Sequence, residues 1–432
     1  MSNILEQAQV AADRQNWPEL IECLQQVTAN GSQPQEQHIL EQAVSLAIAA
    51  LEWGDFQDRW EIAKVFPNLG NCAIAPLIAV LEDEDADTEP RWFAARILGK
   101  FERPEVMQAL VKLVKNSDEE LSQVAAETLG NLGPTVIESL ANLLLQEDSR
   151  QFATAALAQI RRTETIPPLL TVVGDSKVGV RVAAIEALSS FHDSRIPPVL
   201  VAALKDPATA VRKEAVRALG VRPYLDAELD LVNLLKPLLW DIRLEVCQSA
   251  AIALGRLKTD AAAAALFELL QHPTTPVELQ IETVRALSWS ETAVALEYLQ
   301  QTLIAEFNNT NSPVCQEIVT VLGRVEKPEL KAKAAEIAID LLASSHPAVQ
   351  EAGIKKSLAL GLGKLGDMRA LDVLIELLAD ADNSVRLHSL SALKQLSAIE
   401  ARQQLESLVK QESLEPRLKE GIAIALQEWQ EN

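Results

Sequence analysis

A short stretch at residues 89–101 recurs along the chain in weaker form, and it limits the possible folds more than any other feature. It reads Glu-Pro-Arg-Trp-Phe-Ala-Ala-Arg-Ile-Leu-Gly-Lys-Phe, and related copies lie at 180–188, 211–220 and 385–393. The leucines that close successive early copies follow one another at steps of about 28 to 31 residues: Leu98, Leu129, Leu157, Leu188 and Leu219. One unit repeated at this period is typical of a stacked repeat, in which each unit packs only against its neighbours.

Each copy has the pattern of two helices. An apolar segment such as 75–81 is followed by an acidic turn at 82–87 and by a second helical segment at 90–98. Gly99 then follows the last periodic residue, where glycine ends a helix at little cost because it can enter the left-handed region. We therefore predict an all-α fold, a right-handed α-solenoid of about ten to eleven helix pairs.

Composition and charge exclude several functional classes. The net charge of −22 argues against nucleic acid as a partner, because phosphate neutralisation needs a basic surface. No apolar run approaches the roughly 20 residues that cross a bilayer, so no membrane insertion is expected. Residues 1–13 lack the charged-then-apolar pattern of a signal peptide, and we expect a cytoplasmic protein.

The regular pattern begins only after an atypical N-terminal region. Residues 1–70 contain helical segments of uneven length, and terminal repeats are commonly irregular because they cover an otherwise exposed apolar end. We predict an irregular helical cap at 1–70 and a repeat solenoid at 71–432.

An aspartate and an arginine six residues apart recur at four places. The aspartate falls in the turn of a repeat and the arginine in the first turn of the second helix, so stacked copies are expected to form a structural ladder along the solenoid. The four pairs are Asp85–Arg91, Asp175–Arg181, Asp206–Arg212 and Asp380–Arg386.

No residues suggest a catalytic or metal site. The five histidines are isolated, and the four cysteines are far apart without a Cys-x-x-Cys pair. Structural zinc and nucleophilic catalysis both need closer constellations. We assign no catalytic residue, no metal and no cofactor from the residues alone.

The repeat resembles known families. Two helices per roughly 30 residues, with an aspartate turn and Val-Arg, Ala-Ala and Leu-Gly in the second helix, resemble a HEAT repeat. Residues 91–101 are also similar to an Arg-aromatic-aromatic-Ala-Ala-x-x-Leu-Gly-Lys-Phe segment of the phycobiliprotein lyase HEAT-like family, and the resemblance covers about 72–432 at repeat level. This resemblance implies a bilin lyase, a phycobilisome-degradation factor or a scaffold associated with iron–sulfur assembly.

Aromatic and cationic residues are densest near the start of the regular repeats. Second helices are expected to line a concave face, and the helix at 90–98 should point several of these side chains toward it or its edge. Three explanations stay open: filling of the junction between cap and solenoid, contact with a protein partner, or contact with a phycobilin. The candidate residues are Trp60, Trp92, Phe93, Arg96 and Lys100.

A second candidate lies in the middle of the chain and consists of Arg212, Lys213, Arg217 and Arg222. Lys213 and Arg217 are expected to be its more exposed pair, and the alternative explanation is a solvated helix face. With no catalytic constellation, the first hypothesis is a scaffold or adaptor that binds a protein partner in its groove. Under the resemblance, that partner is a phycobiliprotein or a photosynthetic assembly factor. The alternative is a bilin lyase or chaperone with phycobilin as ligand.

Overall fold

The computed structural model describes residues 2–29, 37–305, 313–411 and 413–430. Every regular element within these ranges is a helix, and they contain no strand. The helices follow one another as stacked pairs, so the predicted all-α solenoid is confirmed. The chain divides into two compact units, Met1–Val199 (unit 1) and Leu200–Asn432 (unit 2).

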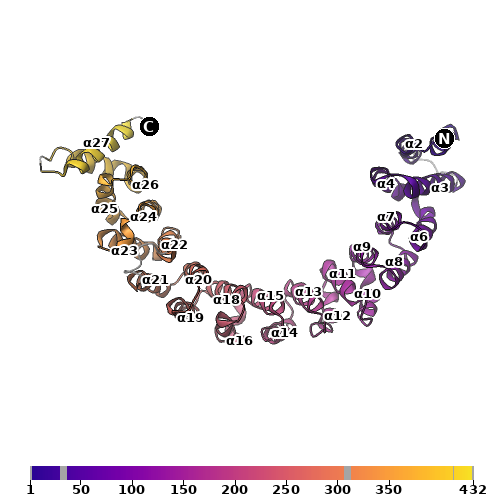
Figure 1. The fold of residues 1–432 in the computed structure, drawn as a ribbon, viewed down its shortest axis with the longest axis horizontal. Coiled ribbons are helices and arrows are strands. Elements are labelled where there is room, and N and C mark those ends of the chain that lie inside the picture. The colour runs from indigo at the N-terminus through magenta and orange to yellow at the C-terminus, as the bar shows by residue number, and fades with distance from the viewer. Residues whose placement is uncertain (1, 30–36, 306–312, 412, 431–432) are drawn as a thin grey trace. The chain divides into compact units, whose positions relative to one another are not determined.

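Unit 1 begins with five α-helices and then continues as helix pairs (Figure 1). Its α-helices are α1 (Ser2–Asp13), α2 (Trp17–Ala29), α3 (Gln37–Trp53), α4 (Phe56–Ala63), α5 (Phe66–Leu69), α6 (Ile74–Glu82), α7 (Thr88–Leu98), α8 (Pro104–Asn116), α9 (Glu119–Asn131), α10 (Ile137–Leu143), α11 (Arg150–Ile160), α12 (Ile166–Leu170) and α13 (Val178–Ser189). Short 3-10 helices precede α6, α10 and α12: η1 (Gly70–Ala73), η2 (Gly133–Val136) and η3 (Thr163–Thr165). The boundary at residue 70 between cap and solenoid remains a prediction.

Unit 2 has the same alternation, and α14 (Ile196–Ala203) spans the division between the units. Its further α-helices are α15 (Thr209–Gly220), α16 (Asp226–Leu229), α17 (Leu231–Leu235), α18 (Leu244–Leu257), α19 (Asp260–Gln271), α20 (Val277–Trp289), α21 (Ala293–Ala305), α22 (Pro313–Leu322), α23 (Pro328–Ala343), α24 (Ala352–Leu365), α25 (Leu371–Glu376), α26 (Asn383–Leu408) and α27 (Pro416–Gln430). The 3-10 helices are η4 (Pro223–Leu225), η5 (Lys236–Trp240), η7 (Pro347–Gln350), η8 (Met368–Ala370) and η9 (Leu377–Ala379).

The helices form two rows within each unit. In unit 1 the second helices of the pairs, α4, α7, α9, α11 and α13, contact one another in succession, and α6, α8 and α10 form the other row. In unit 2 the second helices are α15, α18, α20, α22, α24 and α26. The surface that these second helices present is called the second-helix face of each unit.

Close contact between successive second helices depends on the small residues that surround each closing leucine. A Cβ added to Gly255 would lie 2.5 Å from the Ala286 carbonyl oxygen, and one added to Gly220 would lie 2.6 Å from the Ala253 Cβ. The glycine one position after a closing leucine therefore packs against the residue one position before the next closing leucine. The pairs are Gly99–Thr128, Gly130–Ala156, Gly220–Ala253, Gly255–Ala286, Gly323–Gly361 and Gly363–Ala392.

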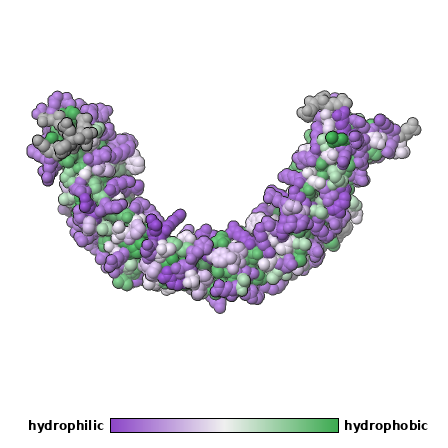
Figure 2. All heavy atoms as spheres, turned by 180° about the vertical axis from the view of Figure 1, so that it is seen from behind, coloured by the Kyte–Doolittle hydropathy of each residue, from purple (hydrophilic) through white to green (hydrophobic). Residues whose placement is uncertain are grey.

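The core is built almost entirely from aliphatic residues, as the low aromatic content predicts. Leucine, alanine, valine and isoleucine make up most of the buried side chains, with Phe66 and Phe93 among the largest. Such small and aliphatic side chains suit close helix packing. The face seen in Figure 2 is mainly hydrophilic, with hydrophobic residues scattered between the polar ones.

Candidate functional site

A hollow of about 780 Å³ opens on the second-helix face of unit 1. Three successive second helices, α4, α7 and α9, supply most of its lining, and α11 adds one side chain. The sequence-predicted residues Trp60, Phe93, Arg96 and Lys100 all line it. The structure therefore brings these four residues, which come from two repeats, around one space.

Local sequence holds Trp60 at the edge of this hollow. Helix α4 is capped by Asp55, whose carboxylate accepts from the Asp58 amide at 2.9 Å, while the Asp58 carboxylate accepts from the Asp55 amide at 3.1 Å. This reciprocal cap fixes the start of a short helix. Trp60 lies one turn later, 44% exposed, with its ring stacked on Phe56 at a centroid separation of 6.4 Å. The site therefore has an exposed aromatic ring on a helix whose start is fixed by its cap.

Of the three cations that line the hollow, Arg96 and Lys100 have no ion pair with a described carboxylate. The Lys100 side chain forms no hydrogen bond or ion pair with a described residue. The Arg96 side chain has only a cation–π contact within the described residues, with its Cζ 4.8 Å from the Trp92 ring centroid. By contrast Lys64, also at the hollow, pairs with Glu61 at 2.7 Å. Two exposed cations beside an exposed indole can therefore meet an anionic or aromatic group of a ligand.

The structure separates the two adjacent aromatics at the start of α7. Trp92 is half-buried and lines a neighbouring depression with Phe56 and Glu120, so it lies beside the hollow and supports Arg96. Phe93 was expected to point toward the groove or its edge, and it does line the hollow, but its side chain is almost fully buried. Phe93 is only 2% exposed because its ring packs edge-on against Phe56 and Trp92, at 5.5 and 5.1 Å. It forms the floor of the hollow.

Lys213 and Arg217 lie on α15 in unit 2 and are both exposed, as expected, but each has a carboxylate partner. Lys213 pairs with Glu245 at 3.0 Å, and Arg217 pairs with Glu214 at 2.8 Å. Neither side chain lines the hollow of unit 1. They do not extend the candidate site.

Three of the four Asp–Arg pairs share one geometry. The guanidinium Nη1 donates to the carbonyl of the aspartate six residues earlier, at 2.7 Å for Arg181 to Asp175, 2.8 Å for Arg212 to Asp206 and 3.0 Å for Arg386 to Asp380. The aspartate side chain in turn accepts from the amide two residues later, at 2.8 Å in each of these turns. These contacts tie the turn of a repeat to its second helix.

The first pair differs. Arg91 donates from Nε to the Leu81 carbonyl at 3.1 Å, not to the carbonyl of Asp85. The residue with the turn geometry is Asp83, which accepts from the Asp85 amide at 3.0 Å. This turn is two residues longer than the others, so the six-residue spacing selected the wrong aspartate.

Successive repeats are also joined by ion pairs that the spacing did not predict. Arg150 pairs with Asp175 at 2.5 Å and Lys355 with Asp380 at 2.5 Å, and Arg212 binds both carboxylate oxygens of Asp241 at 2.7 and 2.8 Å. The Arg212 guanidinium is the largest influence on the pKa of Asp241, which it lowers.

The Asp–Arg spacing did not identify Asp241, because a cysteine stands six residues later, where the four predicted pairs have an arginine. Six residues after Asp241 stands Cys247, whose thiol lies 3.1 Å from the Asp241 carbonyl. Burial raises the pKa of Cys247, so this thiol is held in its neutral form. A search for aspartate six residues before any hydrogen-bond donor would have found this repeat.

The described residues contain no group of three or more His, Cys, Asp or Glu side chains arranged to hold a metal. Within those residues, no single helix is long and apolar enough to cross a membrane, and one bent pair, 56–63 with 66–82, passes on length and composition alone.

The repeats define the family. A profile of HEAT repeats matches residues 74–155, 137–220, 196–281 and 354–427, together more than half of the chain. The chain belongs to the HEAT-repeat family. A search of curated proteins finds no match.

Three longer solved structures have a similar fold. The chain is similar to importin beta, with a TM-score of 0.53 and 16% identity over 97% of this chain and 63% of that one. It is also similar to Kap95p in a structure with RanGDP, with a TM-score of 0.53 and 14% identity over 99% of this chain and 66% of that one. A Kap121p mutant gives a TM-score of 0.55 and 12% identity over 91% of this chain and 50% of that one. The chain spans less than two thirds of each structure, and the likeness shows the fold.

Proposed function

We propose that this HEAT-repeat chain is a non-enzymatic scaffold or adaptor that holds a protein partner on the second-helix face of unit 1. The hollow lined by Trp60, Arg96 and Lys100 is the observation that carries the proposal. Tryptophan and arginine dominate the binding energy of protein interfaces, particularly around a depression that excludes water. Two cations without carboxylate partners in a chain of net charge −22 add a local reason for an anionic contact.

The fold is suited to this role. A stack of helix pairs has a long surface on which each repeat supplies its own exposed side chains. Binding of the similar protein Kap95p induces the switch loops of RanGDP to adopt the GTP-bound conformation. That is a property of Kap95p, and for this chain it supports only the use of such a solenoid to hold a protein.

The partner class that we propose comes from the resemblance of residues 91–101 to the phycobiliprotein lyase HEAT-like family. We place the scaffold in the cytoplasm, in assembly or maintenance of photosynthetic pigment–protein complexes. A phycobiliprotein or an assembly factor would then be the protein held at the hollow.

A second candidate function is a bilin lyase or chaperone. The hollow has the volume of a small-molecule site, since such sites have roughly 300–1,000 Å³. The Trp60 ring could cover a pyrrole, while Arg96 and Lys100 could bind propionates. Under this alternative the phycobilin is the ligand, and an acceptor cysteine lies on a phycobiliprotein.

Affinity capture from a photosynthetic cell extract tests the scaffold. We expect a stoichiometric protein partner with the unchanged chain, and its loss with Trp60→Ala/Arg96→Ala, because removing two hot-spot residues weakens binding by roughly 30-fold or more. The matched control is Gln108→Ala/Lys115→Ala, which alters two exposed residues of α8 in the other row. Equal recovery of the partner by all three proteins would overturn the proposal.

Titration with free phycobilin separates the two functions. A saturable red shift that Trp60→Ala/Arg96→Ala abolishes would favour the lyase or chaperone. Partner capture that is unaffected by pigment, with no spectral change on titration, would favour the scaffold.

A further inference from the structure

The second-helix face of unit 2 carries a row of cationic and aromatic side chains at one repeat position. This position is the second residue after the closing leucine, where each second helix ends. Four consecutive repeats contribute, and we call their residues the end stripe: Arg256, Trp289, Arg324 and Lys364. The contacts Gly255–Ala286 and Gly323–Gly361 fix the register of α18 with α20 and of α22 with α24, and Trp289 and Arg324 line one hollow.

The three cations of the end stripe are exposed, and none forms a hydrogen bond or ion pair through its side chain with a described residue. Several other cations of unit 2 second helices are neutralised: Arg212 by Asp241, Lys213 by Glu245 and Arg285 by Glu317. Within a chain of net charge −22, carboxylates are abundant, yet none of those described pairs with the end stripe.

The fold does not require cations at this position. A positive charge near a helix C-terminus is favoured by the helix dipole. However, three repeats of unit 1 have neutral residues at the same position, namely Asn131, Gln159 and Ser190. The second-helix packing is therefore compatible with neutral residues, and the row of charges needs another explanation.

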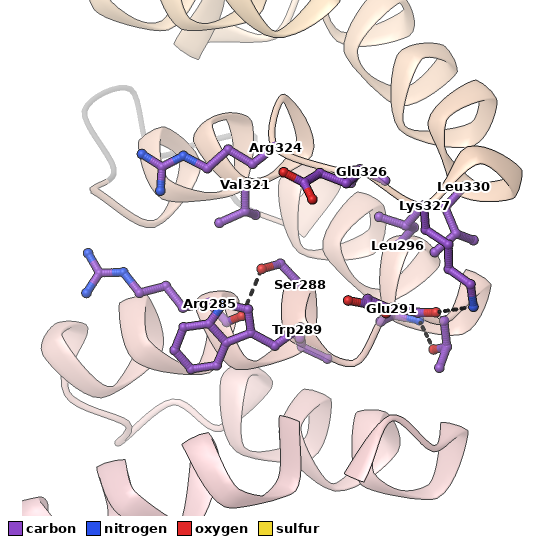
Figure 3. A pocket seen from close by; sticks show the side chains of 14 residues that line it. Arg285, Ser288, Trp289, Glu291, Leu296, Val321, Arg324, Glu326, Lys327 and Leu330 are labelled. Carbon is purple, nitrogen blue, oxygen red and sulfur yellow. Dashed lines mark hydrogen bonds between the residues drawn. The ribbon is translucent and has the colours of Figure 1, made fainter. Parts of the chain in front are cut away.

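A hollow of about 230 Å³ lies at the centre of the stripe, between Trp289 and Arg324. Figure 3 shows the Arg285 and Arg324 guanidinium groups and the Trp289 ring on the same side of this hollow, while Lys327 and Leu330 lie at its other end. Trp289 is 42% exposed. Arg285 is held by Glu317 at 2.9 and 3.2 Å, so Arg324 is the cation that remains available there.

We propose that the end stripe binds an extended acidic peptide segment of a partner protein, which runs across the second helices with about one side chain for each repeat. This surface is separate from the hollow of unit 1 and does not depend on it. The Trp289 ring contacts an apolar side chain of the peptide, and the three cations pair with its carboxylates.

The spacing of the repeats determines the spacing of charges in the peptide. Packed helices lie roughly 10 Å apart. A peptide in the polyproline II conformation has about three residues per turn and advances about 3.1 Å per residue, so every third side chain points to the same side. The stripe therefore matches every third residue of the peptide. A segment of about ten residues with acidic, apolar, acidic and acidic side chains at this interval spans all four positions.

Carboxylates next to the stripe favour a peptide over a nucleic acid. Glu291 and Glu326 line the same hollow as Trp289 and Arg324. A continuous phosphate backbone would place charges against these glutamates as well as against the cations, whereas a peptide can place neutral residues there.

The test uses the full chain and a fluorescent ten-residue peptide, Glu-Ser-Ser-Leu-Ser-Ser-Glu-Ser-Ser-Glu, followed by anisotropy at low salt. A peptide of the same composition with its three glutamates adjacent is the control ligand. We expect saturable binding of the spaced peptide that weakens with added salt. We also expect a loss of roughly tenfold in Arg256→Ala/Arg324→Ala/Lys364→Ala, because three exposed ion pairs are removed.

The control variant is Lys205→Ala/Lys410→Ala/Arg417→Ala, which removes three exposed cations of unit 2 that lie outside the stripe. It should bind the spaced peptide like the unchanged chain. The proposal is overturned by no saturable binding of the spaced peptide, by equal affinity for the two peptides, or by equal loss in both triple variants. Tighter, stripe-dependent binding of a ten-nucleotide RNA would overturn it in favour of nucleic acid.

Discussion

At the scale of single residues, the Leu-Gly that ends many second helices has a packing role. The sequence suggests that such a glycine stops its helix. In the structure α18 continues past Gly255 to Leu257, and Gly255 lies against the backbone of the next second helix, at Ala286. Addition of one methyl group there has no space unless the helices separate. The close approach becomes visible only when the repeats are stacked.

We predict that Gly255→Ala destabilises the protein by about 1–3 kcal/mol, because overpacking forces a backbone shift. The matched control is Gly353→Ala, since a Cβ at Gly353 would have its nearest contact at 3.5 Å from the Gln316 side chain. The control should be neutral or slightly stabilising, as alanine is the better helix former. Urea denaturation compares the two, and equal stability of both variants would show that the helices are not packed this closely.

Asp241 gives a prediction on pH dependence. Its pKa is lowered by the Arg212 guanidinium, so its carboxylate contributes stability above the unfolded pKa of about 3.9. This contribution is lost as the pH falls through the lower folded value. Asp241→Asn should therefore reduce the free energy of unfolding by about 1–3 kcal/mol at pH 7, and by less at each step from about pH 5 to pH 3.

Urea midpoints at several pH values measure this effect. Glu228→Gln is the control, because it removes a negative charge from an exposed residue of unit 2. Its difference from the unchanged chain should stay small throughout. A constant difference between Asp241→Asn and the unchanged chain across the pH range would contradict the assigned ion pair.

At the scale of helices, Arg59 connects three elements at the start of unit 1. It lies on α4, donates to the Leu51 and Glu52 carbonyls at the end of α3 at 2.8 and 2.9 Å, and pairs with Glu89 in the first turn of α7. Arg59 is only 8% exposed. Its guanidinium therefore supplies the hydrogen bonds that water would otherwise donate to the last carbonyls of α3. The sequence placed Arg59 next to Trp60 but did not indicate this connection.

We predict that Arg59→Ala loosens α3, α4 and the start of α7 while leaving unit 2 unchanged, because a solenoid transmits stability mainly to neighbouring repeats. The substitution should cost about 1–3 kcal/mol locally, because the Leu51 and Glu52 carbonyls lose their donor. Hydrogen exchange by mass spectrometry should show faster exchange in 37–63 and 88–98. The exposed Arg103→Ala is the control, and uniform acceleration along the whole chain would contradict the local role.

The helical elements were well predicted because the apolar period repeats many times. The predicted second helix at 90–98 agrees with α7, Thr88–Leu98. Predictions on single turns were weaker. The turn before α7 has two additional residues, and in the repeat after η5 the first turn of α18 has Cys247 where other second helices have arginine. A fixed spacing cannot follow such insertions and replacements.

At the scale of the whole molecule, the candidate site shows what a sequence pattern can and cannot supply. The concentration of aromatic and cationic residues around positions 60 and 91–100 correctly predicted much of the lining on one side of the hollow. Glu127, Asn131 and Gln159 of the neighbouring repeats line it too, and no local signal marked them. They join the site only because α9 and α11 stack next to α7. The end stripe was equally hidden, since its members are 33 to 40 residues apart.

Both surfaces belong to the second helices, so the central claim is that this chain binds proteins through its second-helix face. The most direct measurement places a benzophenone-bearing amino acid at position 60 in place of Trp60 and illuminates the protein in a photosynthetic cell extract. The account predicts a covalent adduct with a discrete protein partner, absent when the same group replaces Gln108 on α8. It also predicts that Arg96→Glu/Lys100→Glu suppresses the adduct. No adduct at position 60, or equal adducts at 60 and 108, would contradict the account.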